Sequence, residues 1–139
     1  MKLAKKYREL FLIPKDDFDI YPYLHLADTI ISDTSSVINE FLALGKIGII
    51  YVLPQTNIKH SDGMEVLSIE PKNWLKGAFV HIDSPENLSY AVEKALNPTE
   101  KMKKKLQEYR DYFFTGLDGR ASERVKKIID RIVFQKGLK

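Results

Sequence analysis

The sequence contains no cysteine in its 139 residues. Because thiol groups are absent, a disulfide framework and a zinc–thiolate site are both excluded. The three histidines, His25, His60 and His81, are scattered along the chain without the spacing of metal ligands. We therefore expect no bound metal and no other cofactor.

Long hydrophobic runs are also missing. No apolar stretch approaches the roughly 20 residues that a membrane-spanning helix needs, and the opening MKLAKKYREL lacks the apolar core of a signal peptide. Apolar residues make up 44% of the chain and charged residues 29%, which is the balance of a globular domain. We expect one domain over residues 1–139, residing in the cytoplasm.

Net charge is small, at +3, but the basic residues are unevenly spread. The segment EKMKKKLQEYR holds four lysines, at Lys101, Lys103, Lys104 and Lys105. These lysines form either a solvated helix face or a contact with a membrane surface or a polyanion. We expect no nucleic-acid partner, because the lysines are not part of an aromatic-interleaved basic motif.

Hydrophobic periodicity predicts strands alternating with helices. The predicted strands cover 9–14, 28–32, 47–52 and 78–82, and the predicted helices cover 19–27, 35–44, 84–96, 97–113 and 121–133. Ser84 is expected to cap the third of these helices, Gly45 to end the second, and His25 to lie on the apolar face of the first. Residues 53–77 show no clean period, and so long an irregular stretch is typically functional or mobile.

This alternation predicts an α/β fold, specifically a three-layer α/β/α Rossmann-like parallel sheet of about four strands with extra C-terminal helices. Four strands are few for a doubly wound sheet. We therefore expect the chain to be a fragment of a longer protein.

The turn SDTSS lies between the strand 28–32 and the helix 35–44. In an open parallel sheet, ligands bind beyond the carboxyl ends of the strands, and a helix N-terminus offers unpaired N–H groups that suit phosphate. Thr34, Ser35 and Ser36 are therefore candidates for binding a nucleotide diphosphate, and Asp33 precedes them in the turn. The alternative is that one of them is an ordinary helix cap. Glu40 is either a ribose ligand or an exposed surface carboxylate.

The stretch ADTIISDTSSVINEFLALGKIGIIY resembles the C-terminal nucleotide-binding domain of GT-B enzymes. More narrowly, it resembles the CDP-glycerol glycerophosphotransferase family of teichoic-acid polymerases. The matching residues are Ala27, Asp28, Asp33, Thr34, Ser35, Ser36, Glu40 and Tyr51. A second motif, DGRASERV at 118–125, resembles the family's Asp-Gly-x-Ala-Ser-x-Arg ending.

This resemblance implies half of a GT-B fold that binds CDP-glycerol for cell-wall polymer synthesis, at the inner face of the cell membrane. It implies that an acceptor hydroxyl attacks phosphorus and a nucleoside monophosphate leaves. It also places the general base in a second domain or partner subunit, so we expect no catalysis by this chain alone.

The second motif and the irregular segment add further candidates. The resemblance makes Asp118 and Ser122 possible ligands, although capping the last helix also explains them. Arg124 could neutralise a diphosphate or be an ordinary solvated arginine. His60 could contact phosphate or transfer a proton, or be a surface histidine.

Two departures from the family pattern keep other functions open. Thr34 stands where the family has tyrosine, and EFLALGK is closer to UDP-sugar glycosyltransferases and UDP-N-acetylglucosamine 2-epimerases, in which the matching glutamate contacts ribose. The alternatives are therefore a UDP-sugar-dependent GT-B domain and a non-catalytic binding module.

Overall fold

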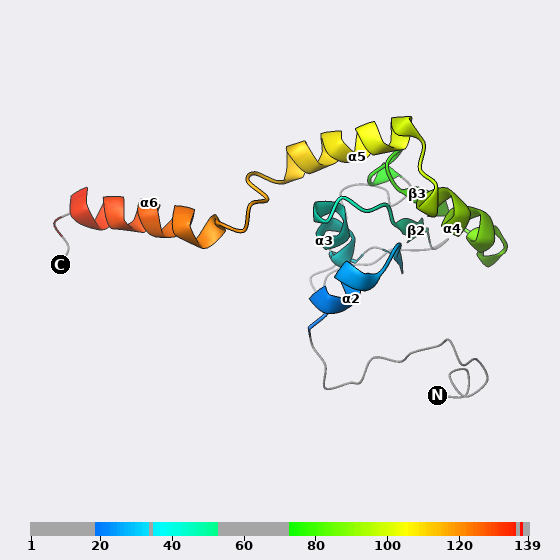
Figure 1. The fold of residues 1–139 in the computed structure, drawn as a ribbon, viewed down its shortest axis with the longest axis horizontal. Coiled ribbons are helices and arrows are strands. Elements are labelled where there is room, and N and C mark those ends of the chain that lie inside the picture. The colour runs from blue at the N-terminus through cyan, green and yellow to red at the C-terminus, as the bar shows by residue number, and fades with distance from the viewer. Residues whose placement is uncertain (1–18, 34, 53–72, 136, 138–139) are drawn as a thin grey trace, which may run out of the picture.

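The computed structural model describes residues 19–33, 35–52, 73–135 and 137 (Figure 1). The described elements, in chain order, are α2 (Tyr21–Leu26), β1 (Ile31–Ser32), α3 (Val37–Ala43), β2 (Ile49–Tyr51), β3 (Val80–Ile82), the 3-10 helix η2 (Pro85–Asn87), α4 (Leu88–Leu96), α5 (Glu100–Phe113) and α6 (Ala121–Gln135). None of the helices in these ranges is both long and apolar enough to cross a lipid bilayer.

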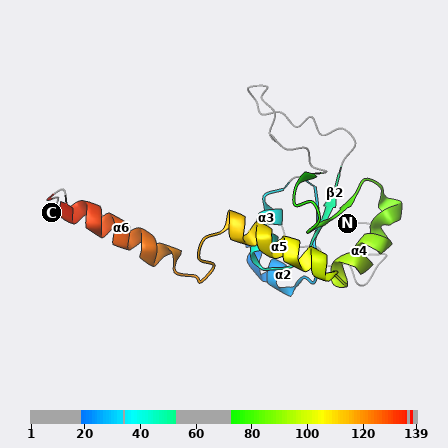
Figure 2. The ribbon, with the colours of Figure 1, turned by 90° about the horizontal axis from the view of Figure 1, so that it is seen from above.

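The sheet is parallel, with strand order β1-β2-β3. Ile49 of β2 pairs with Ile31 on one side and with Val80 on the other. In Figures 1 and 2 the strands lie between α3 and α4, so the three-layer α/β/α arrangement is confirmed. The expected strand over 9–14 lies outside the described residues, which leaves three strands in the described sheet.

The core forms where α3 packs on β2. Ile38, Phe41 and Leu42 follow the spacing of one helix face, and all three have no exposed surface, like Ile49 and Ile50 of β2. A helix of seven residues is too short to be stable alone in water. Its position against the sheet is therefore set by the burial of these side chains.

Two glycines bracket the connection from α3 to β2. Gly45 has a φ of +73°, which confirms the expected glycine stop after the helix. Gly48 is buried, and a Cβ there would lie 2.8 Å from a ring carbon of Phe79 and 3.0 Å from Cγ1 of Ile30. This close approach explains why a glycine directly precedes β2 in an otherwise β-branched run.

Helix α5 lies against the end of α3 that is remote from the SDTSS turn. The hydroxyl of Thr99 accepts a hydrogen bond from the Met102 N–H at 3.3 Å and so caps α5. Met102 and Leu106 are buried, and Arg110 donates to the carbonyl oxygen of Ala43, the last residue of α3, at 3.2 Å. Helix α5 therefore covers the amino edge of the sheet.

Two details differ from the sequence expectations. The segment after β3 begins as a 3-10 turn, and the Ser84 hydroxyl bonds the carboxylate of Glu86 instead of capping the backbone. Ser84 therefore takes the expected N-cap position, but its side chain makes no hydrogen bond to the backbone of the helix. His25 is exposed, and Leu24 takes the buried position on α2, because so short a helix buries only a narrow stripe.

Helix α6 extends away from the rest of the described structure (Figures 1 and 2). It has the expected helical period, yet none of its residues is buried. Its apolar side chains are between 39% and 55% exposed at Val125, Ile128, Ile129, Ile132 and Val133.

The turn that precedes β3 contains one unusual backbone conformation. Leu75 has a φ of +51° although it is only 1% exposed. A leucine in this left-handed region is strained, because its Cβ crowds the backbone. The side chain packs with the core of α3 and β2, and this burial offsets the strain.

Candidate functional site

The carboxyl ends of the three strands meet at one edge of the sheet. Strand β1 ends at Ser32, directly before the polar turn, while β2 and β3 end at Tyr51 and Ile82. Adjacent strands are about 4.8 Å apart, so the residues that follow them form one continuous edge. This is the edge at which open α/β sheets bind ligands.

The polar turn after β1 is open on its solvent side. Asp33 and Ser36 are exposed, and Ser36 directly precedes α3 without a side-chain cap bond. The Ser35 hydroxyl is half-buried and accepts from the Val37 N–H at 3.4 Å. Thr34 lies outside the described residues. The described part of the turn thus presents hydroxyl groups at an accessible helix start, whereas the N–H groups of Ile38 and Asn39 bond the carbonyl oxygens of Ser35 and Ser36.

Glu40 is half-buried on α3, four residues after Ser36. Residues with this separation lie on the same strip of a helix surface. The structure therefore keeps the Glu40 carboxylate in line with the polar turn, one helical turn further from the edge. A ribose ligand and a surface carboxylate both remain compatible with this position.

A cavity of about 430 Å³ opens where β2 and β3 end. Its lining residues are Val52, His81, Ile82, Asp83, Asn87 and Tyr90. The Nε2 atom of His81 lies 2.8 Å from the carbonyl oxygen of Trp74. Because a carbonyl oxygen only accepts, Nε2 carries the proton and Nδ1 is the unprotonated nitrogen when the ring is neutral.

Sequence reasoning missed this cavity. The sequence pattern gave no ligand-binding role to His81, Asp83, Asn87 or Tyr90. Sequence position could have identified these residues, because 83–90 directly follow the carboxyl end of the strand expected over 78–82, where ligands bind in open α/β sheets.

The second motif forms a local lock at the start of α6. The carboxylate of Asp118 accepts from Nη1 of Arg124 at 2.8 and 3.0 Å, and Nη2 of the same arginine donates to the Gly116 carbonyl at 2.9 Å. The hydrogen bond from Arg124 lowers the pKa of Asp118, and the backbone N–H of Arg120 adds to this effect. Ser122 is exposed on the first turn of α6.

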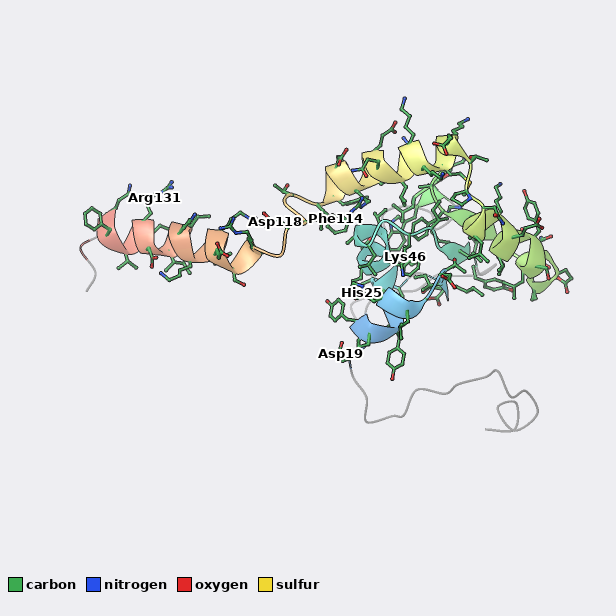
Figure 3. All side chains as sticks on the ribbon, viewed as in Figure 1. Asp19, His25, Lys46, Phe114, Asp118 and Arg131 are labelled. Atoms are coloured by element: carbon green, nitrogen blue, oxygen red, sulfur yellow. The ribbon has the colours of Figure 1, made fainter. Side chains whose placement is uncertain are left out.

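The described structure does not bring this motif to the polar turn. The segment 114–120 follows α5, and α5 contacts the last residue of α3, not its first. Figure 3 shows Asp118 beyond Phe114, on the link toward the projecting α6. The predicted site residues therefore fall into two separate groups. One contains Asp33, Ser35, Ser36 and Glu40, and the other contains Asp118, Ser122 and Arg124. His60 lies outside the described residues.

Within the ranges that the structure describes, no three His, Asp or Glu side chains are gathered as ligands for an ion.

Comparison with known families decides the assignment. The model of the CDP-glycerol:poly(glycerophosphate) glycerophosphotransferase family matches residues 2–131. The chain belongs to this glycerophosphotransferase family. The resemblance drawn from the two sequence motifs is thereby confirmed, and the domain is of the glycerophosphotransferase type. Searches of curated proteins and of solved structures gave no match.

Proposed function

We propose that this chain binds CDP-glycerol at the carboxyl edge of its sheet, as the donor-binding part of a transferase that extends poly(glycerophosphate). The observation that carries the proposal is the family match over residues 2–131. In this proposal the chain is one half of a two-domain GT-B enzyme that makes teichoic-acid-type polymer.

The polar turn is suited to the diphosphate of the donor. Ser36 is accessible at the start of α3, and the hydroxyl of Ser35, which accepts from the Val37 N–H, can still donate its own proton to an anion. Hydroxyl and N–H donors stabilise the negative charge of a diphosphate. Thr34 belongs to the same turn in the sequence and is included in the proposed site.

The cavity beside β3 is suited to an uncharged part of the donor. Asp83 would repel a phosphate group but can accept hydrogen bonds from hydroxyls of ribose or glycerol. Asn87 and the ring of Tyr90 add a donor and an apolar wall. The donor would thus lie along the edge, with its diphosphate at the turn and a hydroxyl-bearing end in the cavity.

In the proposed reaction an acceptor hydroxyl attacks the phosphorus that carries glycerol. The bond from this phosphorus to the bridging oxygen breaks, and cytidine monophosphate leaves with the electron pair. Donors at the turn stabilise the charge that develops on the leaving group. The proton of the acceptor goes to a general base that we assign to the second domain, so this chain alone binds the donor without turning it over.

A nucleotide panel tests the proposal. CDP-glycerol, CDP, UDP and a UDP-sugar would be titrated into the 15N-labelled chain, followed by amide chemical shifts. We expect CDP-glycerol to bind most tightly and to shift amides near Asp33, Ser36 and Asp83. The double variant Ser35→Ala/Ser36→Ala should bind more weakly, while Thr115→Ala on the segment before α6 should not differ from the parent.

Two other outcomes of the nucleotide panel would favour a different function. A preference for UDP ligands would favour a UDP-sugar donor. Lack of shifts with every nucleotide at millimolar concentration would contradict the proposal and leave a non-catalytic module.

A further inference from the structure

The amino edge of the sheet carries a second, strongly basic hollow. It has a volume of about 420 Å³ and is lined by Lys76, Gly77, Lys101, Lys104, Lys105 and Glu108. Its lysines come from two segments that are about 25 residues apart in the sequence. From the sequence, the lysines of α5 formed either a solvated helix face or a contact with a membrane surface or a polyanion. The fold adds Lys76 from a different segment to the same hollow.

Contacts within the described chain hold the two segments together. The hydroxyl of Tyr109 on α5 donates to the carbonyl oxygen of Lys76 at 3.3 Å. The turn that carries Lys76 is closed by hydrogen bonds from the Ala78 and Phe79 N–H groups to the Leu75 carbonyl, both at 3.0 Å. The position of Lys76 beside α5 is therefore fixed through hydrogen bonds to backbone carbonyl oxygens, both at Lys76 itself and within its turn.

The positive charge of this hollow is largely uncompensated. Lys105 pairs with Glu108 at 2.8 Å, and Lys103, which does not line the hollow, pairs with Glu100. Among the described residues, Lys101 and Lys104 make no ion pair, and Lys76 contacts only the side-chain amide of Asn73, at 3.5 Å. Lysines in the first turns of a helix also oppose its dipole, which favours an external anion there.

A hollow lined mainly by aromatic rings continues from the basic one along α5. It also has a volume of about 420 Å³ and shares Lys105 and Glu108 with the basic hollow. Its lining adds the rings of Trp74, Tyr109, Tyr112 and Phe113. The two hollows together form a track with a cationic end and an aromatic end. Such a track suits a chain that alternates phosphate groups with short polyol units.

We propose that this track binds internal phosphates of the poly(glycerophosphate) chain, away from the donor edge. The proposal rests on the proposed function for the identity of the polymer. A membrane surface is the competing partner for lysines near aromatic rings. The shape favours the polymer, because the lysines converge on a hollow that a single chain can enter, whereas a bilayer is flat on this scale.

Binding of glycerophosphate oligomers to the full chain tests the proposal directly. The lysine variant is Lys76→Gln/Lys101→Gln/Lys104→Gln. Its matched control, Lys126→Gln/Lys127→Gln/Arg131→Gln, removes the same charge from the projecting α6. We expect long oligomers to bind the parent and the control equally and to bind the lysine variant about tenfold more weakly. Monomeric glycerol phosphate should bind far more weakly than the oligomers.

Measuring CDP-glycerol affinity as well distinguishes failure of the track from failure of the proposed function. CDP-glycerol affinity should be the same in the lysine variant and the parent, because the donor edge is at the other end of the strands. Equal oligomer binding by both triple variants would overturn the track even if CDP-glycerol binds. A loss confined to the lysine variant would support the track even if no nucleotide binds.

Vesicles that contain phosphatidylglycerol provide the third arm. Binding of these vesicles through Lys76, Lys101 and Lys104, without binding of the free oligomer, would overturn the polymer proposal and assign the surface to the membrane.

Discussion

The ammonium group of Lys46 lies 2.6 Å from the carbonyl oxygen of His25, at the end of α2 (Figure 3). The same group donates to the carbonyl oxygens of Ala27, at 2.8 Å, and Leu24, at 3.3 Å. The last carbonyls of a helix have no partner within it, so a lysine here satisfies three of them at once. This contact fastens α2 to the segment that leads into β2.

Replacing Lys46 by glutamine should therefore destabilise the fold. The shorter, uncharged side chain cannot reach all three carbonyls, and we expect a loss of about 1–2 kcal/mol in the free energy of unfolding. Urea denaturation followed by circular dichroism measures it. Lys127→Gln, on the exposed α6, is the control and should unfold at the parent's urea midpoint. If Lys46→Gln unfolds at that same midpoint, Lys46 does not stabilise the fold through the α2 carbonyls.

Gly48→Ala should be destabilising for a different reason. The added methyl group would meet the Phe79 ring at 2.8 Å, and both partners are held in the core. Overpacking of this kind costs about 1–3 kcal/mol. Thermal unfolding should show a lower midpoint than in Ser89→Ala, which changes an exposed position of α4. An unchanged midpoint would mean that the ring can move aside.

The lock at the start of α6 should weaken in acid. The hydrogen bond from Arg124 lowers the pKa of Asp118 in the folded chain below the ordinary value of about 3.9. A lowered folded-state pKa stabilises the fold above the unfolded value, and the effect is lost as pH falls through the folded value. We therefore expect the side-chain 15N shifts of Arg124 to hold from pH 7 to about 4 and to change below it.

A variant checks that assignment. Asp118→Asn should show the acid-form shifts already at neutral pH, whereas Asp130→Asn, which removes the partner of Lys126, should leave Arg124 unaffected. Arg124 shifts that are the same in Asp118→Asn and the parent would contradict the lock.

The cavity beside β3 yields a prediction about the donor. If Asp83 accepts from donor hydroxyls, Asp83→Ala should weaken CDP-glycerol binding about tenfold, since a hydrogen bond to a charged group contributes about 1.5–3 kcal/mol. Calorimetric titration measures this change. Glu93→Ala, on the exposed side of α4, removes the same charge and serves as the control. Tighter binding by the Asp83 variant would show instead that a phosphate occupies the cavity.

Much of the fold was predictable because local signals and burial agree. The period of Ile38, Phe41 and Leu42 and the stop at Gly45 identified α3, and the β-branched run identified β2. Strand β1 is shorter than predicted, at Ile31–Ser32, although pairing extends to Ile30, whose carbonyl accepts from the Ile49 N–H at 2.8 Å. Strand ends depend on neighbouring strands, which a single sequence does not show.

The candidate site was predictable only in part. The turn with Asp33, Ser35 and Ser36 combines a strand end with a helix start, and both signals are local in the sequence. The cavity around His81 and the hollow around Lys76 depend on which distant segments the fold brings together. Sequence spacing does not reveal which distant segments come together in the fold. For the same reason, the sequence did not indicate that the second motif, at 118–125, lies away from the polar turn.

The strained conformation of Leu75 has a consequence beyond the core. A left-handed leucine costs about 1–2 kcal/mol, while burying its side chain stabilises by about 1.5–3 kcal/mol. The bend that presents Lys76 to solvent is thus unfavourable on its own and is held in place by the burial of the Leu75 side chain. Trimming this one leucine to alanine should therefore disturb recognition of anions at the surface before the whole molecule unfolds.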